Sequence, residues 1–365
     1  MTPTDVSPSG RIFGLDLFRA VAILLVVLRH GGIILGLGGI ENPRWLEVID
    51  GVDLFFVLSG FLIGTILLKE LHRREGLTWP RLARFWKRRW LRTLPNYYLI
   101  LAANVVVVKL GIVHQDIHAI SARFLVFMQN WNSPFTGFFW ESWSLSVEEW
   151  FYLITPLAIL MLLGALRPKW SFLAVTVLML AVPMVFRYQR MDPALDEFWS
   201  GITIGKVVVT RLDSIAYGLL AAWTCFHYRP LWDRVRIPAL AGGALLVVFL
   251  LVHGPFTGLV ARQVLYWSIV PVAAMLLLPA ANSWRRSSGP LGATITHTSK
   301  ISYSMYLINL GLVACVIRDQ FPPVSATDAM IKYVLFWAVV VGVSSFLYRY
   351  FELPVLRLRE KRMWL

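Results

Sequence analysis

The residues best suited to chemistry in this sequence lie near its start, in an apolar stretch that also holds Asp16, Arg19, Arg29 and His30. Arg19 and His30 are eleven residues apart, a spacing that leaves an angular offset of only about 20° on an α-helix. They would therefore share one helix face, about 16 Å apart along the axis, with Asp16 close to that face. This arrangement predicts a site that binds an anion through Arg19 and transfers a proton through the imidazole of His30.

Two adjacent carboxylates, Glu148 and Glu149, form a second group of interest, because they lie several residues inside another apolar stretch. An ionisable group at the middle of a membrane costs at least about 2.5–3.5 kcal/mol, so one or both of them need a partner. His30 is the candidate partner, since a carboxylate behind an imidazole fixes its tautomer and raises its basicity. The structural alternative is that His30 binds a backbone carbonyl and Arg19 reaches lipid phosphates.

A strongly basic segment, residues 69–92, holds nine Lys or Arg against two Glu. Such runs usually bind anionic lipid, and the interleaved aromatic residues predict an amphipathic interfacial helix over 79–92. The last cations, Arg88, Arg89 and Arg92, lie against the next apolar stretch. Guanidinium groups bind phosphate bidentately, so this end of the segment is also a candidate phosphate site.

Other polar residues in apolar stretches have simpler explanations. Asp53 could cap a helix N-terminus, and Arg211 and Asp213 could pair with each other. Gly60 and Gly64 form a small-xxx-small pair that predicts close helix packing. The sequence has no glycine-rich nucleotide loop, no Cys/His metal spacing and no Gly-x-Ser-x-Gly elbow, so nucleoside-triphosphate and metal chemistry are disfavoured and no metal ligand is expected.

The composition shows what kind of element must position these residues. Of 365 residues, 57% are hydrophobic and 15% are charged, whereas a soluble domain has about 25% charged residues. A soluble fold is therefore excluded, and the chain is a polytopic membrane protein. Its net charge of +14 is typical of cytoplasmic loops rich in Lys and Arg, so no nucleic-acid partner is expected. Both cysteines lie in apolar stretches, and a disulfide framework is not expected.

Apolar stretches long enough to cross about 30 Å of hydrocarbon predict an all-α helix bundle with about ten transmembrane helices. These stretches lie near residues 14–36, 51–69, 93–112, 145–166, 170–187, 211–228, 237–253, 262–281, 300–318 and 331–351. Lys and Arg are concentrated in alternate connections, which predicts that both termini are cytoplasmic. We expect one membrane domain over residues 1–365, with an N-terminal tail over 1–11 and a basic C-terminal tail over 355–365.

Seven motifs occur in the order found in the acyltransferase-3 family of integral membrane acyltransferases, which this chain resembles over residues 11–356. Arg19 and His30 match the family's Arg/Lys-x10-His signature. Arg89 and Arg92 match its Arg-x-x-Arg element. The remaining matches are Gly51-Val-Asp-Leu-Phe-Phe-Val-Leu-Ser-Gly, Trp143-Ser-Leu-Ser-Val-Glu148, Arg211-x-Asp213, Ile301-Ser-Tyr-Ser-Met-Tyr-Leu and Tyr348-Arg-Tyr-Phe-Glu-Leu-Pro.

The resemblance implies transfer of an acyl group, most often acetyl, from acetyl-CoA to a hydroxyl of an exported or cell-envelope glycan. It implies a multi-pass protein of the bacterial cytoplasmic (inner) membrane, with acetyl-CoA as co-substrate and no permanently bound cofactor. His30 would act as general base on the acceptor, oriented by Glu148 or Glu149; a covalent acyl-His relay is the rival mechanism. The donor-binding candidates are Arg19, Arg88, Arg89 and Arg92. Further candidate site residues are Asp16, Asp53, Ser59, Ser146, Arg211, Asp213 and Tyr303.

The family commonly has a His where this chain has Asn309, which can form hydrogen bonds but cannot shuttle a proton near neutral pH. We therefore expect no catalytic role for Asn309. Many relatives add an extracytoplasmic hydrolase-like domain, so this chain is expected to act as a stand-alone membrane domain or with a separate partner.

The acceptor is expected to be an exopolysaccharide or a lipid-linked oligosaccharide, although relatives also acylate macrolide-type small molecules. The expected sugar-facing residues are the aromatic residues Trp131, Phe135, Phe138, Phe139 and Trp140. Two other classes stay open: a transporter or exporter of a glycan or small anion, and a sensor that binds acyl groups without turnover.

Overall fold

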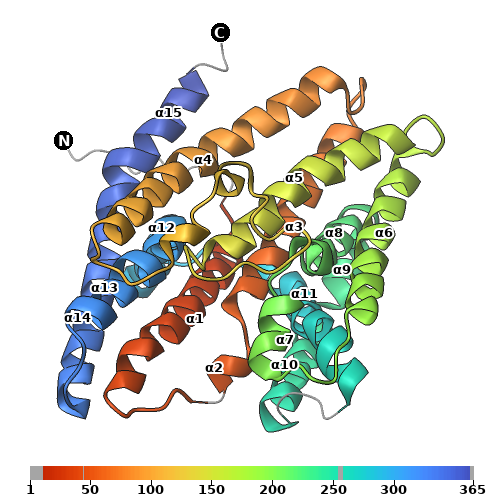
Figure 1. Ribbon diagram of the computed structural model, residues 1–365. Helices are drawn as coiled ribbons and strands as arrows, with labels where there is room; N and C mark the ends of the chain where they lie inside the picture. Colours follow the sequence, from red (N-terminus) through yellow and green to blue (C-terminus); the bar gives the residue numbers. More distant parts are fainter. Residues whose placement is uncertain (1–10, 44, 254–257, 362–365) are drawn as a thin grey trace.

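The computed structural model describes residues 11–43, 45–253 and 258–361, and every regular element in these ranges is a helix (Figure 1). The prediction of an all-α membrane bundle is confirmed. In the described residues, nine helical segments are long and apolar enough to cross a membrane. They are α1 (Phe13–Leu37), α3 (Gly51–Leu71), α4 (Trp79–Lys109), α5 (Ser142–Leu162), α6 (Pro168–Gln189), α10 (Arg236–His253), η4–α11 (Ala261–Ser283), α12–η5–α13 (Gly289–Gln320) and α14–η6–α15 (Ala326–Lys361, apolar as far as Leu358).

The tenth expected span, 211–228, is the shorter helix α8 (Leu212–His227). It runs parallel to α3 along that helix's whole length. Arg211 at its start bonds Asp53 at the start of α3, and the ring of His227 at its end lies 5.3 Å from the ring of His72, just past the end of α3. Because α3 is long enough to span a membrane, α8 crosses the same layer.

Glycines bring α3 and α8 into backbone contact. A Cβ on Gly60 would lie 2.0 Å from the carbonyl oxygen of Ile215, and a Cβ on Gly218 would lie 2.1 Å from that of Val57. A Cβ on Gly64 would meet the side chain of Ala222 at 2.8 Å. The close packing predicted for Gly60 and Gly64 is confirmed, and its partner is α8.

The first and last helices of the bundle begin and end on the same side. Asp16 in α1 and Glu352 at the end of the π turn η6 (Tyr348–Glu352) both bond serines of α12 (Gly289–Ile308): Ser299 donates to Asp16 at 2.8 Å and Ser304 to Glu352 at 3.2 Å. An even number of crossings, with α8 included, produces this arrangement. The predicted tail over 355–365 is helical as far as Lys361 in α15 (Leu353–Lys361); residues 1–10 and 362–365 lie outside the described residues.

The predicted interfacial helix over 79–92 and the span that follows it form one continuous helix, α4, of 31 residues. Pro80 stands in its first turn, where a missing N–H costs nothing, and Pro95 lies inside it, close to the end of the basic segment. Figure 1 shows α4 and α5 crossing the bundle, with α10 and α11 (Tyr266–Ser283) at one end and α14 (Ala326–Leu347) at the other.

Short helices fill the connections between these segments. The 3₁₀ helices η1 (Ile117–Ala119) and η2 (Ala122–Val126) lie between α4 and α5. The helix α2 (Trp45–Val48) follows α1, and α7 (Glu197–Thr203), η3 (Val208–Thr210) and α9 (Arg229–Arg234) flank α8. In the connection before α5, Phe138 and Phe139 are fully buried, so the expectation that they face a sugar is wrong; their area stabilises the bundle core instead.

Two fully buried ion pairs lie between helices. Arg187 at the end of α6 bonds Asp213 of α8 at 2.7 Å, and Arg211 bonds Asp53 of α3 at 2.5 Å. The predicted pairing of Arg211 with Asp213 is therefore wrong, because side chains two positions apart at the start of a helix do not face each other, and each meets a neighbouring helix instead. Asp53 is not an N-cap either: Asp50 caps α3 by accepting a hydrogen bond from the Val52 amide at 2.9 Å.

Candidate active site

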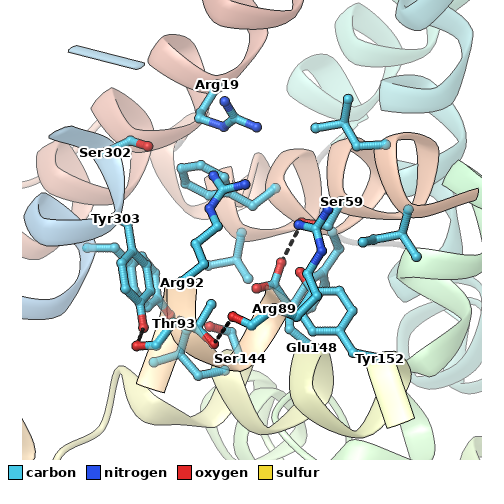
Figure 2. A pocket seen from close by; sticks show the side chains of 17 residues that line it. Arg19, Ser59, Arg89, Arg92, Thr93, Ser144, Glu148, Tyr152, Ser302 and Tyr303 are labelled. Carbon is cyan, nitrogen blue, oxygen red and sulfur yellow. Dashed lines mark hydrogen bonds between the residues drawn. The ribbon is translucent and has the colours of Figure 1, made fainter. Parts of the chain in front are cut away.

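A cavity of about 100 Å³ lies between α1, α3, α4, α5 and α12. Figure 2 shows its polar lining, to which each of these helices contributes. Its volume is below the roughly 300–1,000 Å³ of pockets that enclose a whole small molecule. The cavity therefore suits one end of a longer ligand. The polar residues that line it are Arg19, Ser59, Arg89, Arg92, Thr93, Ser144, Glu148, Tyr152, Ser302, Tyr303 and Tyr306.

The charge of the cavity lining is positive. Arg19 comes from α1, while Arg89 and Arg92 lie one helical turn apart on α4, so the Arg-x-x-Arg spacing brings both to the same side of that helix. Glu148 is the single carboxylate among the lining residues. Three guanidinium groups around one carboxylate favour an anionic ligand with several phosphate oxygens.

Glu148 and Glu149 are held by hydroxyl groups of two different helices. Ser59 of α3 donates to Glu148 Oε1 at 2.6 Å, and Thr93 of α4 donates to Glu149 Oε1 at 2.8 Å. Tyr303 donates to the Thr93 carbonyl at 2.8 Å, which joins α12 to the same wall (Figure 2). The predicted pairing of either glutamate with His30 is not found, because adjacent positions on α5 point toward α3 and α4.

His30 instead bonds Asn309, with 2.5 Å between Nδ1 and Oδ1. The amide nitrogen of Asn309 donates to the carbonyls of Met305 and Tyr306, both at 2.8 Å, so its oxygen must face the imidazole. An amide oxygen only accepts, and Nδ1 of His30 therefore carries the hydrogen. In the neutral ring this leaves Nε2 with a free electron pair, the form that a general base requires.

Tyr306 connects the cavity with His30. Its hydroxyl lies in the cavity wall, 2.6 Å from that of Ser144, and its own carbonyl accepts the hydrogen bond from Asn309. The cavity lining thus leads from the arginines and Glu148 to Ser144 and Tyr306. Hydrogen bonds continue this series from Tyr306 through Asn309 to His30. Arg19 and His30, predicted to share a face of α1, lie at opposite ends of this series.

The other predicted site residues lie outside the cavity. Asp16 binds Arg11 at 2.6 Å and fixes the start of α1, and Ser146 donates to the Ser142 carbonyl at 3.4 Å within α5. Arg88 is exposed and does not line the cavity. Asp53, Arg211 and Asp213 belong to the buried ion pairs described above. Of the further candidates, Ser59 and Tyr303 are the two that the cavity includes.

Several residues of the site have no individual signal in the sequence. Thr93, Ser144, Tyr152 and Tyr306 are ordinary polar residues in apolar helices, and only packing brings them together. Asn309 carries a signal, because the resemblance predicts a histidine at this position and an amide keeps the capacity to form hydrogen bonds. When one polar residue replaces another inside a span, the hydrogen bonds are retained more readily than the ability to transfer a proton.

The side of His30 away from the cavity carries further charged groups. Arg29 lies 3.8 Å from Asp50. The Lys206 ammonium lies 5.6 Å from the centroid of the Trp140 ring, and burial, together with the charge of Arg29, lowers the pKa of Lys206. This end of the bundle therefore presents polar groups that suit a hydroxylated ligand better than an acyl chain.

Comparison with known proteins gives matches along almost the whole chain. A family model described as "Acyltransferase domain" matches residues 12–349. The O-acetyltransferase OatA of Staphylococcus aureus strain NCTC 8325 / PS 47 is 26% identical over 373 residues, which cover 94% of this chain and 57% of that protein. OatA of strains COL and MRSA252 matches to the same extent. The chain thus spans little more than half the length of these curated relatives, and no solved structure matches it.

Proposed function

The chain belongs to this acyltransferase family, and on that premise we propose that it is a membrane O-acetyltransferase that moves acetyl from acetyl-CoA to a hydroxyl of an exported or cell-envelope glycan. The name of these relatives, O-acetyltransferase, supports both the acetyl group and the oxygen acceptor. The observation that carries the proposal is the continuous series from a cationic cavity to a histidine with a free Nε2. We place the protein in the bacterial inner membrane with both ends cytoplasmic, as one membrane domain.

The cationic end of the cavity suits the donor. Phosphate groups of CoA bind Arg19, Arg89 and Arg92, and the exposed part of Arg92 meets the nucleotide outside the cavity. The small cavity then holds the acetyl end of the molecule beside Ser144 and Tyr306. Acetyl-CoA is made in the cytoplasm, and this orientation agrees with the basic segment before the cavity.

The chemistry follows from the tautomer of His30. Nε2 takes the proton of the acceptor hydroxyl while the hydroxyl oxygen attacks the thioester carbonyl. The C–S bond then breaks, and the imidazolium returns the proton to the sulfur, so that CoA leaves as the thiol. Asn309 holds the ring through Nδ1 and keeps Nε2 free. Glu148 is placed to orient groups in the cavity through Ser59. A covalent acetyl-His intermediate at the same Nε2 is the rival mechanism.

The polar far side of His30 suits the acceptor. Trp131 and Trp140 stay partly exposed, and an exopolysaccharide or lipid-linked oligosaccharide is the proposed substrate; a macrolide-type molecule is the alternative. The competing function is a transporter of a glycan or small anion, which would use the same charges without forming a product.

Purified protein, assayed in detergent for transfer and in reconstituted vesicles for uptake, tests this function with radiolabelled acetyl-CoA and candidate glycans. Labelled glycan supports transfer, uptake into vesicles without labelled glycan supports transport, and retention of donor alone supports sensing. His30→Ala is expected to lower transfer by about a hundred- to ten-thousand-fold, with acetyl-CoA affinity unchanged. Transfer near the normal rate in this variant, at normal folding, would show that His30 is not the base.

A further inference from the structure

The helix that carries Asn309 is irregular at that residue. α12 ends at Ile308 and continues as a π-helical turn, η5 (Asn309–Ala314), before α13 (Cys315–Gln320). π turns inside α-helices are frequent at functional sites, because the extra residue redirects a side chain. Here the turn begins at Asn309, which bonds Nδ1 of His30. A residue that fixes the geometry of the turn therefore also fixes the orientation of the imidazole.

Glu141, the residue before α5, bonds one residue of this turn and one residue of α12, on either side of Asn309 in the sequence. Its carboxylate Oε1 accepts a hydrogen bond from the Gly311 amide at 3.0 Å, and its backbone carbonyl accepts one from the Tyr306 hydroxyl at 2.8 Å. The Gly311 amide is thus bound by the side chain of the residue that precedes α5, while the Tyr306 carbonyl is bound by the Asn309 side chain.

The contact with Gly311 depends on the absence of a side chain there. A Cβ at this position would lie 2.3 Å from Asn104 Oδ1 and 3.1 Å from Glu141 Oε1. Glu141 is 1% exposed, and neither its Oε2 nor Asn104 Oδ1 has a hydrogen-bond partner among the described residues. A buried carboxylate without an ion pair is costly unless another role keeps it, and the contact with Gly311 supplies that role.

We propose that Glu141 is a positioning residue for His30: its side chain holds the π turn so that Asn309 keeps the imidazole in the tautomer with a free Nε2. Only the predicted change in activity rests on the proposed function, because the tautomer of His30 can be measured separately. Glu141 does not touch the reacting atoms. It acts through Gly311 and Asn309.

Two substitutions separate positioning from a general need for a carboxylate. Glu141→Ala removes the bond to Gly311 but leaves the backbone bond to Tyr306. Glu141→Gln keeps an acceptor for Gly311 and adds an amide donor for the unpartnered oxygens nearby. We expect Glu141→Ala to lower kcat by about 10–100-fold, the scale for outer partners of a functional histidine, with KM for acetyl-CoA unchanged, and Glu141→Gln to restore most of the rate.

The decisive measurement is ¹⁵N NMR of the histidine rings, with the His30 signals assigned by their loss in His30→Ala. The parent protein and Glu141→Gln should show one tautomer with Nδ1 protonated, and Glu141→Ala a mixture of tautomers. The matched control is Glu352→Ala, which removes another buried carboxylate from a different π turn and should leave the His30 signals as they are.

The outcomes keep this proposal distinct from the proposed function. A His30 tautomer unchanged in folded Glu141→Ala would overturn the positioning role, whatever the activity. A tautomer change in Glu141→Ala, combined with full transfer by His30→Ala, would uphold the positioning role and overturn the general-base function. Loss of folding in Glu141→Ala and Glu141→Gln alike, against a folded Glu352→Ala, would assign Glu141 to stability alone and also overturn the proposal.

Discussion

Arg187 and Arg211 are fully buried and each bonds one aspartate at 2.5–2.7 Å, whereas Arg19, Arg89 and Arg92 surround a cavity with one carboxylate. We call the first two the sealed arginines and the other three the cavity arginines. Arg187 lies in α6 and Arg211 directly precedes α8, while the cavity arginines lie in α1 and α4. The two groups differ in how their positive charge is neutralised. Each sealed arginine is neutralised by one aspartate, whereas the cavity lining has more arginines than carboxylates and keeps an excess of positive charge.

This comparison teaches how an intramembrane charge is to be interpreted. A buried ion pair that loses one partner leaves an uncompensated charge, so its removal is expected to act on stability. A cation that faces a cavity is expected to act on binding and to leave stability nearly unchanged. The three predictions below test this division, and a reversal of either effect would contradict it.

The largest effect is expected for Asp213→Ala. Arg187 would lose both bonds to Asp213 and keep those to the Thr210 carbonyl and Ser268, at a cost of about 3–5 kcal/mol in unfolding free energy. Thermal unfolding in detergent measures this loss, and acetyl-CoA affinity of the folded fraction should not change. Asp233→Ala, which breaks an exposed pair with Arg229, is the control and should unfold at the normal temperature. Reduced donor affinity at normal stability would move Arg187 to the binding group.

A smaller effect is expected for Arg92→Ala or Arg89→Ala. Each should weaken acetyl-CoA binding by about 1.5–3 kcal/mol, the scale of a charge-assisted hydrogen bond, with the unfolding temperature unchanged. Lysine at either position should restore binding only in part, because the bidentate fork is lost. Calorimetric titration with CoA measures both, and Arg84→Ala, an exposed arginine of the same helix, is the control. Normal affinity in both alanine variants would assign these arginines to lipid.

The smallest effect is expected from salt. Charges within partly open sites are screened over about 10 Å at 0.1 M ionic strength. The dissociation constant of CoA should therefore rise severalfold when the salt concentration is raised from about 0.05 M to about 0.5 M. The sealed arginines lie away from solvent, and the unfolding temperature should change little over the same range. Salt-independent CoA binding would show that its phosphates do not meet the open end of the cavity.

Much of the fold was predictable because hydropathy sets the position of each span. Nine of the ten expected stretches are spans by length and composition within the described part of the chain. The tenth, α8, has 16 residues and is identified as a crossing by its contacts with α3. The helix predicted over 79–92 is also present, as the first part of α4, which continues beyond it without a break.

The sequence identified several residues of the site, but not which residues pair with one another. Helical spacing places Arg19 and His30 on a face but does not say which helix that face meets. The partner of His30 is 279 residues away, and that of Arg211 is 158 residues away, so both depend on how the helices pack. Arg187 falls at the end of a span, and its burial follows from a contact with Asp213 that local sequence does not encode.

The contact of α3 with α8 has a mechanical consequence for the cavity. With backbone against backbone at Gly60 and Gly218, and an ion pair at one end, the two helices cannot slide or separate without breaking both features. One wall of the cavity, formed by Val52, Phe55, Ser59 and Leu62 of α3, is therefore stationary. Any gating motion that admits a ligand wider than the cavity must come from the other lining helices, α1, α4, α5 and α12. Among these, α4 has an internal Pro95 and α12 continues into the π turn η5.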